Sequence, residues 1–338
     1  MSIHELEATT LQLAVPGKGI LAADESTGTI TKRFNSVQVE PTTENRRAYR
    51  ELLFTTPGIS DFINGVILFE ETLGQRAGNG KLFSDLLAEQ NIIPGIKVDK
   101  GVTPLPGTLE ETITQGLDGL SERLQNYKHM GARFAKWRGV LKISTQEPSC
   151  LAMAANAEAL ARYAAICQAQ GIVPIVEPEL LMDGDHTLEH CAQATEKTLH
   201  TVFAALIKYK VILECMILKP NMVLPGAGHQ SQANIKDVAQ ATLKVLRRTV
   251  PAAVPSINFL SGGQSAEDAT KHLQAMNTNR PQPWLLSFSY GRALQDPCLK
   301  TWRGQAENIQ AAQQVFYKRA KLNSAACKGQ YTDVMENG

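Results

Sequence analysis

The chain has 338 residues, of which 43% are hydrophobic, and a formal net charge of +1 at pH 7. A chain of this length can bury a large core, and a charge this close to zero argues against a nucleic-acid or anionic-membrane partner. No apolar run approaches the roughly 20 residues that span a bilayer, and the six cysteines include no C-x-x-C pair. We therefore expect a soluble, cytoplasmic protein with reduced thiols.

Short apolar runs alternate with amphipathic segments along the chain. Strands are predicted at Gly19–Ala23, Gly65–Phe69, Ile92–Val98, Phe134–Val140, Val173–Val176, Cys215–Leu218, Ser256–Leu260 and Leu285–Phe288. Helices are predicted at Thr112–His129, Ala152–Gln170, Leu188–Tyr209, Ala233–Thr249, Ala266–Met276 and Ala306–Leu322. This alternation predicts βαβ units and a parallel sheet.

The number of these units indicates how the sheet is arranged. Eight units with no break in composition favour a closed (β/α)8 TIM barrel. The first strand is not followed by the G-x-G-x-x-G turn that an open doubly wound sheet usually carries. We therefore expect one domain over residues 1–338, with N-terminal and C-terminal extensions and a short tail from about 324 to 338.

Ionisable or anion-binding residues stand at the ends of seven of the eight predicted strands. In chain order, the strand ends carry Asp24 and Ser26, Lys97, Lys136 and Arg138, Glu177 and Glu179, Lys219, Ser261 to Gly263, and Ser289 to Arg292. Because active sites of such barrels form at the carboxyl ends of the strands, we expect these residues to share one site. A buried lysine beside other cations favours the neutral amine, which attacks carbonyl groups, and Lys219 fits this description.

Two segments near the end of the chain are suited to phosphate. In Ser261-Gly262-Gly263 the glycines allow close approach of the backbone to an anion, and the guanidinium of Arg292 after Gly291 matches phosphate geometry. Barrels frequently bind phosphate after strands seven and eight. Arg46, in contrast, lies in a charged stretch whose pattern is that of a solvated helix face.

One motif suggests a metal, but its context does not support a metal site. Residues His186 to His190 match H-x-x-E-H, a zinc-peptidase pattern. The motif follows a turn and begins a helix, and the other histidines are scattered without ligand spacing. We expect no metal site.

Several segments together resemble the class I (Schiff-base) fructose-1,6-bisphosphate aldolases. They lie in family order between about residues 16 and 331: 17–28, 95–101, 135–138, 176–179, 218–221, 259–264 and 288–294. The resemblance implies a metal-independent lyase of glycolysis and gluconeogenesis that reversibly cleaves fructose 1,6-bisphosphate to dihydroxyacetone phosphate and glyceraldehyde 3-phosphate. It also implies a homotetramer and no cofactor beyond the covalent imine of the substrate with Lys219.

The same resemblance implies roles for individual residues. Lys219 would form the Schiff base, Glu177 would act as acid and base, and Asp24 and Lys136 would orient the C4 hydroxyl of the substrate. The C1 phosphate would lie at Ser261, Gly262, Gly291 and Arg292, and the C6 phosphate at Ser26 and Lys97. Arg46 aligns with a substrate-contacting arginine of the family, and the wider substrate-binding set adds Arg138, Glu179, Gly263 and Ser289.

The sequence departs from the family at Thr29, where many members have serine, and at its C-terminus, which lacks the family's terminal tyrosine. One hypothesis is that Tyr331 or solvent returns a proton to the enamine. Two other functions remain open on the residues alone. The first is a phosphosugar isomerase or transaldolase, in which an isomerase would use Glu177 as its base, and the second is a non-catalytic binding protein.

Overall fold

The computed structural model describes residues 3–144, 148–278 and 281–337. Within them, eight parallel strands close into a barrel in the order β1-β10-β9-β8-β7-β6-β3-β2. The barrel strands are β1 (Gly19–Ala23), β2 (Ile63–Leu68), β3 (Ile93–Lys97), β6 (Phe134–Leu141), β7 (Val173–Leu180), β8 (Ile217–Leu218), β9 (Ser256–Phe259) and β10 (Leu285–Tyr290). The predicted (β/α)8 barrel is therefore confirmed.

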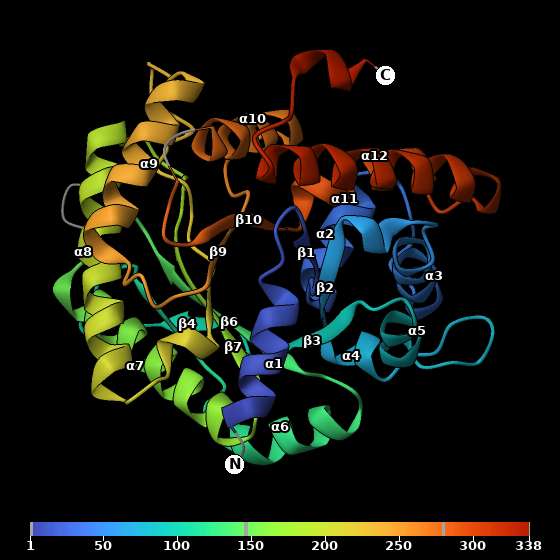
Figure 1. Ribbon diagram of the computed structural model, residues 1–338, viewed down its shortest axis with the longest axis horizontal. Helices are drawn as coiled ribbons and strands as arrows, with labels where there is room; N and C mark the ends of the chain where they lie inside the picture. The colour runs from blue at the N-terminus through green and yellow to red at the C-terminus, as the bar shows by residue number, and fades with distance from the viewer. Residues whose placement is uncertain (1–2, 145–147, 279–280, 338) are drawn as a thin grey trace.

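Helices surround this barrel, with α7, α8 and α9 on one side in Figure 1 and α3 and α5 on the other. They are α1 (Ile3–Leu13), α2 (Thr27–Asn35), α3 (Thr43–Phe54), α4 (Glu70–Leu73), α5 (Phe83–Glu89), α6 (Leu120–His129), α7 (Cys150–Ala169), α8 (Leu188–Lys208), α9 (Ile235–Thr249), α10 (Ala266–Asn277), α11 (Arg292–Trp302) and α12 (Ile309–Cys327). Among the described residues, no helix combines the length and apolarity needed to cross a membrane.

One predicted helix was wrong in its first half. The segment expected to be helical from Thr112 instead starts with β5 (Thr112–Thr114), which pairs antiparallel with β4 (Val102–Pro104). Gly116 and Gly119 follow with φ of 120° and 62°, a backbone conformation that does not continue a right-handed helix. Helix α6 therefore begins only at Leu120.

The end of the chain also differs from expectation. A helix was expected over Ala306–Leu322, but a short 3-10 helix occupies Ala306–Asn308 and α12 continues to Cys327. The segment after α12 is held to this helix, because the Arg319 guanidinium donates to Glu336 Oε1 at 2.7 Å. The last residues described are therefore docked against α12.

The barrel interior is filled at its amino-terminal end. Ile20, Ile67, Phe134 and Ile175 from four strands form a buried cluster with Leu6 of α1. Close packing of this kind requires glycine on neighbouring strands: a Cβ added at Gly95 would lie 2.3 Å from the Phe134 ring. Helix α1 thus closes this end, and the opposite end is left for a site.

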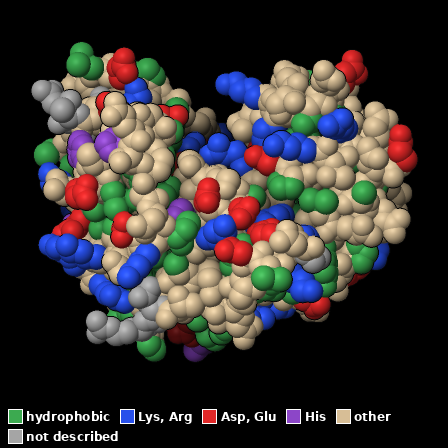
Figure 2. Space-filling view, turned by 90° about the horizontal axis from the view of Figure 1, so that it is seen from above, with side chains coloured by type: hydrophobic (Ala, Val, Ile, Leu, Met, Phe, Trp, Pro, Cys, Tyr) green, Lys and Arg blue, Asp and Glu red, His purple; other side chains and the backbone are tan. Residues whose placement is uncertain are grey.

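In the face drawn in Figure 2, Lys and Arg side chains are interspersed with Asp and Glu. This agrees with the net charge of +1. Any binding of anions must therefore depend on local groups rather than on a general positive field.

Candidate active site

Most of the predicted site residues gather in one pocket of about 430 Å³. It lies at the carboxyl ends of the barrel strands and contains Asp24, Ser26, Lys97, Lys136, Arg138, Glu177, Glu179, Lys219, Ser261, Gly262, Ser289, Gly291 and Arg292. Two of the predicted residues, Arg46 and Gly263, do not line it. Segments that are far apart in sequence meet here because the barrel brings all strand ends together.

Lys219 follows β8 directly and is almost fully buried, with 3% of its surface exposed. Its backbone N–H donates to Val176 O at 2.8 Å, which continues the pairing of β8 with β7. This pairing places Lys219 next to Glu177, the residue after Val176, and the Lys219 Nζ lies 3.2 Å from Glu177 Oε1. A buried ammonium needs such a partner, because its desolvation is otherwise expensive.

Lys136 joins this pair to a second carboxylate. Its Nζ lies 3.1 Å from Glu177 Oε2 and 2.7 Å from Asp24 Oδ2, and its own exposure is 4%. The four side chains form a continuous buried series in the order Asp24, Lys136, Glu177 and Lys219, with alternating charge. The two ends of the series come from β1 and β8, which are not neighbours in the barrel.

Burial and neighbouring charges determine the protonation states of two members of this series, Asp24 and Lys136. Burial raises the pKa of Asp24, but Lys136 and Lys219 outweigh it and lower that pKa to about 2. Burial lowers the pKa of Lys136, whereas Asp24 and Glu177 raise it well above its usual range. Asp24 is therefore an anion and Lys136 a cation at neutral pH, so Lys136 is suited to holding and polarising rather than to nucleophilic attack.

The arrangement differs from the sequence expectation in one respect. Lys136 and Arg138 were expected to act on Lys219 as neighbouring cations. Instead, Glu177 stands between Lys136 and Lys219 and contacts both. Arg138 is engaged by Glu179, to which its Nε donates. The group that faces Lys219 most closely is thus a carboxylate able to exchange protons with it.

Groups suited to binding an anion lie on one side of the buried series formed by Asp24, Lys136, Glu177 and Lys219. The Ser289 hydroxyl is 99% buried and has no hydrogen-bond partner among the described residues, although it lines the pocket. A Cβ at Gly262 would lie 3.2 Å from Glu179 Oε1, and one at Gly291 would lie 3.4 Å from Ala22 O. A side chain at Gly262 would therefore crowd Glu179, and both glycines line the pocket together with Arg292.

The two predicted residues outside the pocket have structural roles. Gly263 has φ of 76°, and a Cβ there would lie 2.7 Å from Met182 Cβ, so this glycine is needed for the turn and for packing. Arg46 lies on α3, where its Nε donates to Glu71 Oε2 at 3.0 Å and its Nη1 donates to Pro41 O at 2.6 Å. The Arg46 guanidinium is thus bonded to Glu71 and Pro41 and does not line the pocket, and its contact with substrate stays a prediction.

Four polar residues that line the pocket were not predicted as site residues: Glu25, Thr29, Lys32 and Arg33. The last three lie on α2 at the spacing of one helix face, and this spacing was the signal available in the sequence. The hydroxyl of Ser26 caps the same helix, accepting from Thr29 N at 3.4 Å. The pocket therefore has a second polar side, formed by the first two turns of α2.

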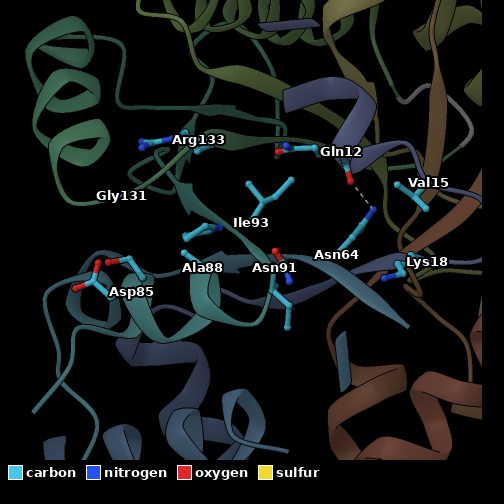
Figure 3. Close-up of a pocket in the computed structure, with 13 residues that line it drawn as sticks. Gln12, Val15, Lys18, Asn64, Asp85, Ala88, Asn91, Ile93, Gly131 and Arg133 are labelled. Atoms are coloured by element: carbon cyan, nitrogen blue, oxygen red, sulfur yellow. Dashed lines mark hydrogen bonds between the residues drawn. The ribbon is translucent and has the colours of Figure 1, made fainter. Parts of the chain in front are cut away.

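A larger cavity of about 540 Å³ lies near the other end of the barrel (Figure 3). In Figure 3 the Asn64 amide reaches Gln12, and its Nδ2 donates to Gln12 O at 3.0 Å. Lys18 in this cavity donates to Ser60 O at 2.7 Å and not to a carboxylate. This cavity lacks a lysine–carboxylate pair among its lining residues, so amine chemistry points to the smaller pocket.

The remaining sequence hypotheses concern His186, His190 and Tyr331. His190 N donates to Thr187 Oγ1 at 3.1 Å, so the H-x-x-E-H motif begins α8 as a capped helix start. In residues 3–144, 148–278 and 281–337, no group of three His, Cys, Asp or Glu side chains is placed to hold a metal ion. The Tyr331 hydroxyl donates to Glu336 Oε1 at 3.1 Å, and Tyr331 does not line the pocket.

Comparison with known proteins gives one consistent result. The family model "Fructose-bisphosphate aldolase class-I" (Glycolytic) matches residues 5–338. Cytosolic fructose-bisphosphate aldolase 4 of Arabidopsis thaliana is 56% identical over 329 residues, covering 97% of this chain and 84% of the plant protein. Fructose-bisphosphate aldolase B of Bos taurus is 56% identical over 335 residues, covering 98% and 92%.

A solved structure agrees with the sequence comparison. The fructose-bisphosphate aldolase of Plasmodium falciparum, solved in complex with TRAP and a small-molecule inhibitor, superposes with a TM-score of 0.96. The two chains are 52% identical, and the match covers 97% of this chain and 95% of the other. The barrel, the buried lysine pair and these matches lead to one assignment: the chain belongs to the class I fructose-bisphosphate aldolase family.

Proposed function

We propose that this protein reversibly cleaves fructose 1,6-bisphosphate to dihydroxyacetone phosphate and glyceraldehyde 3-phosphate through a Schiff base on Lys219. Members of its family are named for this substrate. The single observation that carries the proposal is the contact of the buried Lys219 with Glu177, 3.2 Å from Nζ to Oε1, inside a pocket with polar groups on two sides. This pair supplies an amine and a proton carrier in one place.

In the first step, the neutral amine of Lys219 adds to the C2 carbonyl of the substrate. Glu177 in its acid form then protonates the resulting hydroxyl, water leaves, and a protonated imine remains. Glu177 is placed for this step because it reaches Lys219 directly. No metal is needed in this scheme, because the protonated imine itself is the electron sink.

In the second step, the Glu177 carboxylate takes the proton of the C4 hydroxyl. The C3–C4 bond breaks, its electron pair moves toward the imine nitrogen to form an enamine, and glyceraldehyde 3-phosphate leaves as the aldehyde. Asp24 and Lys136, joined at 2.7 Å, orient and polarise the C4 hydroxyl. A proton then returns to C3, and water hydrolyses the imine to release dihydroxyacetone phosphate. Tyr331 lies outside the pocket, which favours solvent as the source of that proton.

The two phosphates are proposed to lie on opposite sides of Lys219. The C1 phosphate fits Ser261, Gly262, Gly291 and Arg292, with Ser289 supplying a hydroxyl that has no other partner among the described residues. The C6 phosphate fits Ser26 and Lys97, and the cations of α2, Lys32 and Arg33, line the same region of the pocket. Arg138 and Glu179 complete the substrate-binding wall.

Reductive trapping tests the covalent step. Borohydride added with fructose 1,6-bisphosphate in the presence of a chelator should fix one triose phosphate on Lys219, detected by peptide mass spectrometry. Lys219→Ala should abolish both label and cleavage, while Lys81→Ala, at an exposed lysine paired with Glu89, should change neither. Conversion of the substrate to an isomer, with neither cleavage nor label, would favour an isomerase that uses Glu177 as its base, and loss of activity on chelation would contradict a metal-free reaction.

Assembly, location and domain extent are further parts of the proposal. We propose a single domain over residues 1–338 that forms a homotetramer, as is common in the family, and light scattering at working concentration tests the tetramer. We also propose a cytoplasmic location, which is supported by relatives named as cytosolic or cytoplasmic isozymes. Fractionation of the source cells with an antibody against this chain tests that location.

A further inference from the structure

A buried arginine lies directly behind the pocket without lining it. Arg50 on α3 is 97% buried, and its Nη1 lies 2.7 Å from Glu25 Oε2. Glu25 is the only carboxylate in ion-pair contact with Arg50 among the described residues. Burying a guanidinium costs desolvation free energy. We therefore take the Arg50–Glu25 ion pair to have a role other than keeping the protein surface soluble.

Glu25 divides its two oxygens between Arg50 and the wall of the pocket. Its Oε1 accepts from Arg33 Nη1 and, at 2.9 Å, from Gln295 Nε2. Arg33 has a second carboxylate partner, since its Nη2 lies 2.8 Å from Asp296 Oδ1. Glu25 and Arg33 line the pocket, and so Arg50 reaches the pocket only through Glu25.

The charges of this cluster balance only when Arg50 is present. Two guanidiniums, of Arg33 and Arg50, face two carboxylates, of Glu25 and Asp296. Burial raises the pKa of Glu25, but Arg50 and then Arg33 lower it below its usual value, so Glu25 is ionised. Without Arg50, two carboxylates would face Arg33 alone, and the cluster would carry a net charge of −1.

Gln295 links the same cluster to the catalytic strand end. It is fully buried, and its Nε2 donates to Ala22 O at 2.6 Å as well as to Glu25. Ala22 lies on β1, two residues before Asp24. Residues of α3 and α11, Arg50 and Gln295, therefore hold Glu25 in position. The two carboxylate oxygens of Glu25 contact two different arginines, Arg50 and Arg33.

We propose that Arg50 is a positioning residue that, by neutralising part of the charge of Glu25, keeps the cluster around Arg33 electrically balanced beside the phosphate of the substrate that lies next to α2. The inference rests on the proposed function, in which a phosphate occupies that side of the pocket. It assigns to a buried residue outside the pocket a role in affinity for bisphosphates over monophosphates. Arg50 would act on binding, and Lys219 and Glu177 would be unaffected.

Steady-state cleavage of fructose 1,6-bisphosphate and fructose 1-phosphate tests the assignment. In Arg50→Gln we expect KM for the bisphosphate to rise about tenfold, because the cluster beside the phosphate then carries one net negative charge, with kcat within about twofold. KM for fructose 1-phosphate should not change. Arg47→Gln is the matched control, because Arg47 lies on the same helix and pairs with Glu44 at 2.7 Å, outside the pocket.

Two further variants separate charge balance from a merely structural role. Glu25→Gln combined with Arg50→Gln removes one charge of each sign, so KM for the bisphosphate should return toward the wild-type value. Glu25→Gln alone leaves two guanidiniums and should tighten bisphosphate binding, which keeps the inference testable even where Arg50→Gln does not fold. Equal KM changes for both substrates, or a double variant worse than Arg50→Gln, would overturn the inference.

Failure of the proposed function would be seen separately. Hexitol 1,6-bisphosphate has no carbonyl and forms no imine, so its affinity, measured by titration calorimetry, reports on phosphate binding alone. If the wild-type protein does not cleave fructose 1,6-bisphosphate, the proposed reaction is wrong. An unchanged affinity for hexitol 1,6-bisphosphate in Arg50→Gln would contradict the role of Arg50 whatever the reaction.

Discussion

Replacing Lys136 by methionine separates the structural from the chemical role of the buried charge series. Lys136 lies 2.7 Å from Asp24 and 3.1 Å from Glu177, and it has 4% of its surface exposed. Methionine has a similar length without charge, so the change leaves Asp24 without an ion-pair partner among the described residues and Glu177 paired with Lys219 alone.

The size of the effect follows from the state of Asp24. Its pKa of about 2, against 3.8 for a free carboxyl, corresponds to about 2 kcal/mol of net stabilisation of the anion at neutral pH. Lys136 is the largest source of that stabilisation, and breaking a buried ion pair by removing one partner typically costs about 3–5 kcal/mol. We expect Lys136→Met to lose about 3 kcal/mol of unfolding free energy and about a thousandfold in kcat.

Urea unfolding followed by circular dichroism measures the first quantity, and a coupled cleavage assay measures the second. Asp24→Asn together with Lys136→Met should regain most of the stability but none of the activity. Lys81→Met, which breaks the exposed pair with Glu89, should change the unfolding free energy by less than about 1 kcal/mol. A Lys136→Met protein as stable as wild type, or a double variant with additive losses, would refute the reasoning.

Three further predictions concern single groups. Lys219→Met should remain folded yet show neither borohydride label nor cleavage, and a residual label would mean that another lysine forms the imine. Ser289→Ala should raise KM a few-fold without loss of thermal stability, because the hydroxyl has no partner among the described residues to lose; a clear fall in melting temperature would contradict this view. Burial lowers the pKa of His272 to about 4, so the unfolded chain binds the proton first as pH falls below 6.5. The protein should lose about 2 kcal/mol between pH 7 and 5 on this account, and His272→Gln should flatten that slope in urea titrations.

The barrel was predictable because each strand is a short apolar run between helical segments, and β1 was predicted with the bounds that it has. The structure of the segment from Thr112 was not predictable in the same way, since hydrophobic periodicity alone does not reveal a short antiparallel pair of strands. Gly116 and Gly119 were the local signal against a continuous helix. Tertiary pairing with β4 decided the outcome, and such pairing is invisible in a single segment.

The composition of the site was predictable to a similar degree, and for a related reason. Strand ends converge in a barrel, so Asp24, Lys136 and Lys219 could be placed together from the sequence. Helix α2 was harder, because its cations reach the pocket only through the turn that its cap sets. The pairing of Arg46 with Glu71 depends on distant chain segments and has no local signal.

The sequence of ion-pair contacts from Asp24 through Lys136 and Glu177 to Lys219 explains why the two buried lysines of one pocket have different roles. Lys136 contacts two carboxylates and its pKa is raised, so it stays a cation throughout the reaction. Lys219 contacts one, Glu177, and that carboxylate is itself shared with Lys136. Lys136 is thus held as a cation by two carboxylates, whereas Lys219 has an ion-pair contact with only one among the described residues, and that one is shared. The shared carboxylate is the group in direct reach of Lys219 for proton exchange, so Lys219 rather than Lys136 has the surroundings that a nucleophilic amine needs.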